Sequence, residues 1–222
     1  MFQKEVYTQI LNEIPSHVQL VAVSKTYGID VIQNAYDEGV RVFGENKVQE
    51  LVPKAEALPK DIRWHLIGHL QTNKVKYIAP FVEMIHSVDS FKLLQEIQKQ
   101  ALKNNRTIKV LLQFHISYEE TKFGFNPENL DMLLKEEIWN QIPNVQICGV
   151  MGMASFSEDM NQVRNEFKSL KNIFDTLKKS QLFSDSFKEI SMGMSGDYKI
   201  AVEEGSTMIR VGSALFGKRN YA

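Results

Sequence analysis

The stretch Val21-Ala22-Val23-Ser24-Lys25-Thr26 decides how the rest of the chain is interpreted. Its apolar and small residues lead into a lysine, which predicts a buried strand that ends at Lys25 or Thr26. Burial at a strand end disfavours the charged form of a lysine, so the Lys25 amine becomes a candidate nucleophile towards carbonyl compounds. The alternative is a surface lysine just past the strand, and the rest of the chain decides between the two.

Seven further strand-like segments follow, and helical segments alternate with them. Strands are predicted over 40–44, 64–70, 84–88, 109–116, 145–153, 189–194 and 207–211. Helices are predicted over 2–14, 29–36, 47–58, 74–78, 90–104, 126–137, 160–177 and 197–204. This alternation favours right-handed crossovers and a parallel sheet. Eight units predict one α/β domain over residues 1–222, a closed (β/α)₈ TIM barrel with an extra N-terminal helix.

Composition predicts a soluble cytoplasmic protein. Hydrophobic residues make up 43% of the 222 residues and charged residues 24%, as in ordinary globular domains. A net charge of −1 predicts no nucleic-acid partner, and Lys218-Arg219 is too small a basic cluster to change this. No apolar run reaches the roughly 18 residues that a membrane span needs, and no secretory signal is present. The single cysteine, Cys148, excludes an internal disulfide and is predicted to be buried and unreactive.

Polar residues collect at the predicted carboxyl ends of the strands, where barrels of this type carry their functional groups. Lys25 ends the first strand and Asn46 follows the second. Ser195-Gly196 follows the seventh strand, just before a helix, and Gly212-Ser213 follows the eighth. Each Gly-Ser pair alone is typical of an ordinary turn, but two of them at adjacent strand ends predict a phosphate site. Together with Lys25, they suggest a phosphorylated aldehyde as the ligand.

The histidines do not predict a metal centre. His65 and His69 at i, i+4 would suit zinc on a helix, but on a strand they share a face some distance apart, and no carboxylate pattern supports a metal. His86 and His115 lie within predicted strands and are interpreted as core or rim residues. The sequence contains no Walker loop, nucleophile elbow or Rossmann fingerprint.

Several motifs resemble one known family in order and spacing. They are 22–26, Phe43-Gly44-Glu45-Asn46 with Gln49-Glu50, 64–74, Lys122-Phe123-Gly124-Phe125, 192–195 with Asp197, and 205–217. The family is that of the pyridoxal-phosphate homeostasis proteins, which are single-domain relatives of the alanine racemase N-terminal barrel (fold type III of pyridoxal-phosphate proteins). The resemblance covers about residues 18–217.

The resemblance implies a role for each candidate residue. Lys25 would form an imine with pyridoxal 5′-phosphate, and Arg210 would face the pyridine nitrogen. The implied phosphate-binding residues are Ser195, Gly196, Gly212 and Ser213, and the implied pocket neighbours are Asn46 and either His65 or His69. Arginine stays protonated, so it donates to the pyridine nitrogen and keeps that nitrogen unprotonated. An unprotonated pyridine is a poor electron sink, which restrains carbanion chemistry.

Three functions remain open at this point. The first is a pyridoxal-phosphate carrier in vitamin B6 and amino-acid homeostasis, with no established catalytic residue of its own and with apo-enzymes as candidate recipients. The second is an amino-acid racemase, which needs acid–base groups on both cofactor faces. In alanine racemases a tyrosine from a C-terminal β-domain supplies one of them, and this chain ends five residues after Gly217. The third is an aldolase-like barrel that uses Lys25 as a Schiff base. Without the second domain, a monomer is expected.

Overall fold

Eight parallel strands close into a barrel in a computed structural model that describes residues 2–117, 123–183 and 185–217. Lys122, Lys218 and Arg219 lie outside these ranges. The strands are β1 (Gln19–Val23), β2 (Val42–Glu45), β3 (Arg63–Leu66), β4 (Met84–Val88), β5 (Ile108–Gln113), β6 (Val145–Met151), β7 (Glu189–Met194) and β8 (Met208–Val211). Each strand pairs with the next in sequence, and β1 pairs with β8. The predicted closed barrel is confirmed.

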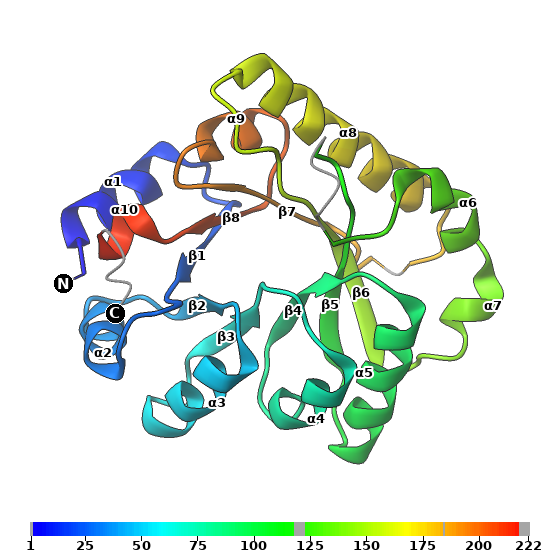
Figure 1. Cartoon of the computed structure of the whole chain (residues 1–222), viewed down its shortest axis with the longest axis horizontal. Helices are drawn as coiled ribbons and strands as arrows, with labels where there is room; N and C mark the ends of the chain where they lie inside the picture. Colours follow the sequence, from blue (N-terminus) through cyan, green and yellow to red (C-terminus); the bar gives the residue numbers. More distant parts are fainter. Residues whose placement is uncertain (1, 118–122, 184, 218–222) are drawn as a thin grey trace.

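The helices form a ring outside the strands (Figure 1). They are α1 (Lys4–Glu13), α2 (Ile29–Asp37), α3 (Val48–Ala57), α4 (Val75–Ile78), α5 (Phe91–Lys103), α6 (Leu130–Leu133), α7 (Glu136–Trp139), α8 (Met160–Lys179), α9 (Tyr198–Glu203) and α10 (Ser213–Phe216), with 3₁₀ turns η1 (Thr72–Lys74) and η2 (Pro127–Asn129). In α8, apolar side chains three and four residues apart are buried, and Asp159 caps the first turn. None of the helices in the described ranges is long and apolar enough to cross a membrane.

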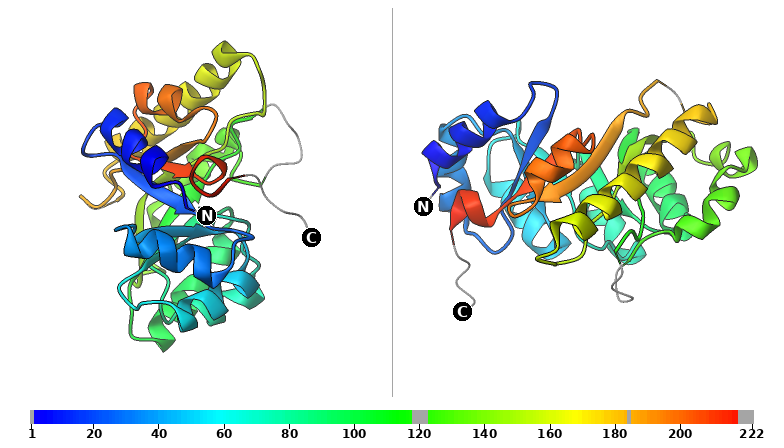
Figure 2. Two further views of the ribbon diagram at one scale, coloured as in Figure 1. Left: turned by 90° about the vertical axis from the view of Figure 1, so that its left-hand side faces the viewer. Right: turned by 90° about the horizontal axis from the view of Figure 1, so that it is seen from above.

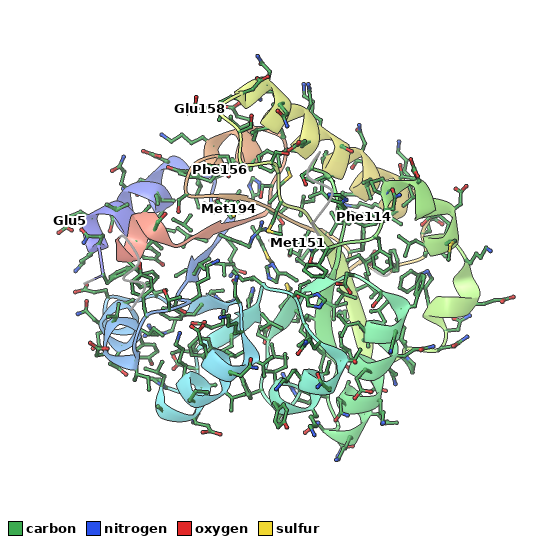
Figure 3. All side chains as sticks on the ribbon, in the orientation of Figure 1. Glu5, Phe114, Met151, Phe156, Glu158 and Met194 are labelled. Carbon is green, nitrogen blue, oxygen red and sulfur yellow. The ribbon has the colours of Figure 1, made fainter. Side chains whose placement is uncertain are left out.

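The barrel interior holds its own apolar cluster, separate from the larger core between strands and helices. Its buried members are Met84, Leu111, Cys148, Met151 and Met208. Figure 3 shows Met151 near the centre of the ring of strands. Cys148 is buried, as predicted. Burial raises the pKa of its thiol to about 11, so the thiol stays protonated at neutral pH. The interior is therefore packed and not an open channel.

The helix α1 lies beside α10 (Figure 2). The Gln3 amide donates to the Leu215 carbonyl at 2.8 Å, and the Phe2 and Phe216 rings lie 5.7 Å apart. The predicted extra N-terminal helix is confirmed, and it ties the start of the chain to the last helix of the barrel.

Some predicted boundaries were wrong. The third strand ends at Leu66, because its partner β2 ends at Glu45, which is paired with Leu66. The chain then turns so that a Cβ on Gly68 would lie 2.4 Å from the Asn46 carbonyl oxygen. The helix predicted over 126–137 is divided into η2, α6 and α7, and α10 was not predicted. These segments are short, and short segments carry little periodicity.

Candidate functional site

The predicted phosphate turns and Lys25 lie together at the carboxyl ends of β7, β8 and β1. Lys25 is half-buried and lies two residues after β1, whereas the turns follow β7 and β8. The Gly212 amide donates to Ser195 Oγ at 3.3 Å, so the two turns contact each other. A Cβ on Gly212 would lie 3.2 Å from the Val23 carbonyl oxygen, so β1 approaches this turn closely. A Cβ on Gly196 would meet nothing within 4 Å.

The turn that carries Lys25 has a strained backbone. Thr26 has a φ of 71°, in the left-handed region that β-branched residues avoid. Its amide donates to Glu50 Oε2 at 2.7 Å, which anchors the turn to α3. The Lys54 ammonium, also from α3, donates to the Ser24 carbonyl at 3.0 Å. Two side chains of one helix thus hold the backbone on either side of Lys25.

A buried carboxylate completes this arrangement. Glu45 Oε1 accepts from the Ser24 hydroxyl at 2.6 Å and from Lys54 Nζ at 2.7 Å. Glu45 is fully buried, and its Oε2 has no hydrogen-bond partner among the described residues. Burial raises the pKa of Glu45 above its ordinary value, against the attraction of Lys54. We call Ser24, Glu45, Glu50, Lys54 and the Thr26 amide the Lys25-turn network.

Asn46 follows directly after the buried Glu45 and is half-buried itself. Gly68 packs against its backbone, so no side chain fits between the two loops. Asn46 therefore lies at the carboxyl end of β2, the strand next to β1, as predicted.

Arg210 lies inside the barrel, on β8, with only 4% of its surface exposed. Its Nη1 donates to Ser191 Oγ at 2.6 Å, and its Nη2 donates to the Gly152 carbonyl at 3.1 Å. Burial lowers the pKa of Arg210 to about 10, and the charge of Asp197 opposes this. The guanidinium is therefore still protonated at neutral pH.

His65 does not lie with the other predicted site residues at the strand ends. It occupies an inner position of β3, where its Nδ1 lies 2.8 Å from His86 Nε2. His86 Nδ1 in turn lies 2.9 Å from Ser191 Oγ. His65 thus connects to Arg210 through two other side chains. We call Arg210, Ser191, His86 and His65 the Arg210 network.

Three other residues from the sequence analysis have partners elsewhere. His69 follows the end of β3, where its Nδ1 lies 3.1 Å from Asp89 and its ring stacks on Phe123. The Tyr27 hydroxyl donates to the Gly217 carbonyl at 2.7 Å. The Tyr198 hydroxyl donates to Glu13 of α1 at 2.6 Å, on the outside of the barrel.

Sequence reasoning missed most of the residues that support the site. Lys54 was interpreted only as part of a helix, and Ser191 only as part of a strand. Polar residues within otherwise apolar strands were the available signal for Ser191 and His86. Among the described residues, no group of three or more His, Cys, Asp or Glu side chains lies close enough to hold a metal ion.

Comparison with known proteins gives a consistent result. The profile of the alanine racemase N-terminal domain matches residues 5–220. A pyridoxal phosphate homeostasis protein of Aquifex aeolicus is 43% identical over 204 residues, which cover 91% of this chain and 88% of that protein. The structure of PipY from Synechococcus elongatus, with pyridoxal phosphate bound, aligns with a TM-score of 0.86 at 35% identity and covers 96% of this chain and 99% of PipY.

An alanine racemase from Bartonella henselae shares the fold more distantly. It aligns with a TM-score of 0.73 at 14% identity, over 98% of this chain and 60% of the racemase. At this identity the likeness concerns the barrel alone.

Proposed function

Because this chain belongs to the family of pyridoxal phosphate homeostasis proteins, we propose that it binds pyridoxal 5′-phosphate through Lys25 and serves intracellular homeostasis of that cofactor. The observation that carries the proposal is the contact between the two phosphate turns beside the strand that leads to Lys25. This arrangement offers an amine and an anion-binding cradle at one end of one barrel.

The residues present fit this cofactor. The proposed phosphate-binding residues are Ser195, Gly196, Gly212 and Ser213, which offer two hydroxyls and glycine backbone that a ligand can approach closely. The open space around Gly196 supports this assignment. When bound, pyridoxal phosphate supplies an aldehyde that takes up amines reversibly. The Lys25-turn network holds the backbone that presents the lysine, and Asn46 lies on the next strand end.

Arg210 is proposed to donate to the pyridine nitrogen. It is protonated at neutral pH, and arginine has no acceptor atom, so it faces an unprotonated nitrogen. This electronic setting favours holding the cofactor over activating it. Since the Tyr27 and Tyr198 hydroxyls are both occupied elsewhere, we assign no racemisation reaction to the chain.

The remaining expectations are proposals as well. The chain acts as one domain over residues 1–222, as a monomer in the cytoplasm, and passes the cofactor to apo-enzymes that depend on it. Nucleic acid and membranes are not proposed as partners.

Absorption spectroscopy of the purified protein with added pyridoxal phosphate tests the proposal. We expect a visible band that borohydride converts into a fixed adduct on a Lys25 peptide, as read by mass spectrometry. Lys25→Ala removes both the band and the adduct. Lys188→Ala is the control, because Lys188 precedes β7 at the opposite end of the barrel. A wild-type protein that takes up no pyridoxal phosphate, or a Lys25→Ala variant that keeps the band, would overturn the proposal.

A further inference from the structure

The Arg210 network crosses the barrel interior from β8 through β7 and β4 to β3. Its four side chains are all buried, with no more than 4% of any of them exposed. Its three links measure 2.6, 2.9 and 2.8 Å, all within hydrogen-bonding distance. Among the described residues no carboxylate forms an ion pair with Arg210, and the acceptors of its two hydrogen bonds, Ser191 Oγ and the Gly152 carbonyl, are neutral.

The donor and acceptor capacities of the four side chains give each link a direction. A guanidinium only donates, so Ser191 Oγ is the acceptor of the Arg210 hydrogen bond. Within the described residues, His86 Nδ1 is the acceptor in reach of the Ser191 hydroxyl, so that nitrogen carries no proton. A neutral imidazole then carries its proton on Nε2, and His86 Nε2 donates to His65 Nδ1. By the same rule, His65 carries its proton on Nε2.

The network ends at a cavity on the opposite side of the barrel from Lys25. This cavity, of about 330 Å³, is lined by residues at the amino ends of the strands, among them Arg63, Lys109 and His65. Since His65 Nδ1 is engaged with His86, its Nε2–H is the group left to face the cavity. The volume accommodates several water molecules, which can accept that hydrogen bond.

We propose that Ser191, His86 and His65 are positioning residues for Arg210, forming a hydrogen-bond row of fixed direction that holds the guanidinium and ends as a donor at the amino-end cavity. The role in cofactor binding rests on the proposed function, because it requires Arg210 to face the pyridine ring. Two donors of Arg210 are held by Ser191 and Gly152, which leaves its other N–H groups to face the cofactor. A charged His86 would repel the guanidinium, so both histidines have to stay neutral.

The surroundings keep the histidines neutral. Burial, together with the charges of Arg63 and Lys109, lowers the pKa of His65 to about 3. Burial likewise holds the pKa of His86 well below its ordinary value, with His65 and Arg210 adding to the effect. The lowered pKa values agree with the neutral state of both rings, and the hydrogen-bond geometry then assigns each proton to Nε2.

Nitrogen-15 NMR of histidine side chains in the protein without added cofactor tests the fixed direction. At pH 7 we expect His65 and His86 to be neutral, each with its proton on Nε2. A proton on Nδ1 of His86, or a doubly protonated ring, would overturn the proposal. This measurement needs no bound cofactor, so it stands even if the proposed function fails.

Three serine variants test the positioning role. Ser191→Ala removes the acceptor for Arg210, and we expect pyridoxal phosphate to bind about tenfold more weakly, with a shifted absorption band. Ser191→Thr restores the hydroxyl and should recover both properties. Ser206→Ala is the matched control, because within the described part of the chain the buried Ser206 hydroxyl forms hydrogen bonds only with backbone carbonyl oxygens, those of Ile190, Met192 and Met208.

The outcomes separate the two proposals. If wild type binds through Lys25 and Ser191→Ala behaves like Ser206→Ala, the positioning role is wrong and the proposed function stands. If wild type takes up no pyridoxal phosphate, the proposed function is wrong, and the NMR result alone then tests whether the hydrogen-bond row has the proposed direction. Should Ser191→Ala fail to fold, the NMR spectra of the wild type and the affinity of Ser191→Thr decide.

Discussion

Two polar networks support the candidate site, and they differ in charge. The Lys25-turn network pairs the Lys54 ammonium with the carboxylate of Glu45, at 2.7 Å. In the Arg210 network the cation is the guanidinium, which donates to a hydroxyl and to a carbonyl oxygen. The network then continues through two neutral imidazoles. The first network holds a strained backbone in place, and the second holds a side chain.

The difference predicts opposite responses to pH. The folded pKa of Glu45 is raised, so its contribution to stability is present at low pH and is lost as pH rises through that folded pKa. The folded pKa values of His65 and His86 are lowered, so their contributions are present above the unfolded value near 6.5 and are lost as pH falls. Burial disfavours the charged form of each group, so it raises the pKa of a carboxyl group and lowers the pKa of an imidazole.

Removal of the cation from the Lys25-turn network should have the largest effect. Lys54→Met leaves Glu45 buried without its charge partner, and we expect the free energy of unfolding to fall by about 3–5 kcal/mol. Urea denaturation at pH 7 measures the change. Lys47→Met, at an exposed position just before α3, should stay within about 0.5 kcal/mol of wild type. A loss below about 1 kcal/mol for Lys54→Met would show that Glu45 does not depend on the pair.

Acidification should break the Arg210 network next. Each histidine that is neutral when folded costs about 1.4 kcal/mol per pH unit below 6.5, so the pair should lose about 4 kcal/mol between pH 6.5 and 5. Denaturation at a series of pH values gives the slope. His65→Gln should reduce this slope by about 1.4 kcal/mol per pH unit. A flat profile in this window would contradict the neutral state of the pair.

One serine from each network sharpens the comparison further. Ser191→Ala leaves both Arg210 Nη1 and His86 Nδ1 without this partner, and we expect a loss of about 2–3 kcal/mol. Ser24→Ala should cost only about 1 kcal/mol, because Lys54 still donates to Glu45. Thermal and chemical denaturation of both variants measure the difference. Equal losses in the free energy of unfolding would mean that the two hydroxyls contribute equally to stability, which would contradict this prediction.

The smallest expected effect is a gain. Thr26→Gly relieves the left-handed backbone at a φ of 71° and keeps the amide that donates to Glu50. The strain energy removed is larger than the entropic cost of fixing a glycine, which is more flexible in the unfolded chain. We therefore expect the free energy of unfolding to rise by about 0.5–1 kcal/mol. Thr26→Ala is the control, since alanine keeps part of the strain. Destabilisation by Thr26→Gly would indicate that the threonine side chain itself holds the turn.

Much of the fold was predictable because the strands of a parallel barrel are apolar runs and their helices are amphipathic. The long helix α8 and the strand β7 were found at nearly their observed ends. The end of β3 was missed because apolar residues continue past Leu66 after the pairing stops. The strand β3 ends where its partner β2 ends, and the periodicity of one segment carries no information about the length of its partner strand.

The site was predictable only where residues lie within two positions of a strand end. Lys25, Asn46 and the two phosphate turns obey this rule. Lys54 does not, because it reaches Ser24 and Glu45 from α3, and its sequence position indicates only that it belongs to a helix. The contact between His86 and Ser191 joins residues 105 positions apart, which only closure of the barrel brings together.

The contact of α1 with α10 has a consequence for how the chain folds during synthesis. The Tyr27 hydroxyl meets the Gly217 carbonyl 190 residues later, and β1 meets β8 across a similar interval. Until the ribosome has released β8, one edge of β1 has no strand to pair with, although the neighbouring units can already assemble. Closure is the longest-range event in the chain and is expected to be slow. A nascent chain stalled before β8 should therefore remain protease-sensitive at β1. In such a chain β1 lacks its partner strand β8, and α1 lacks its neighbour α10.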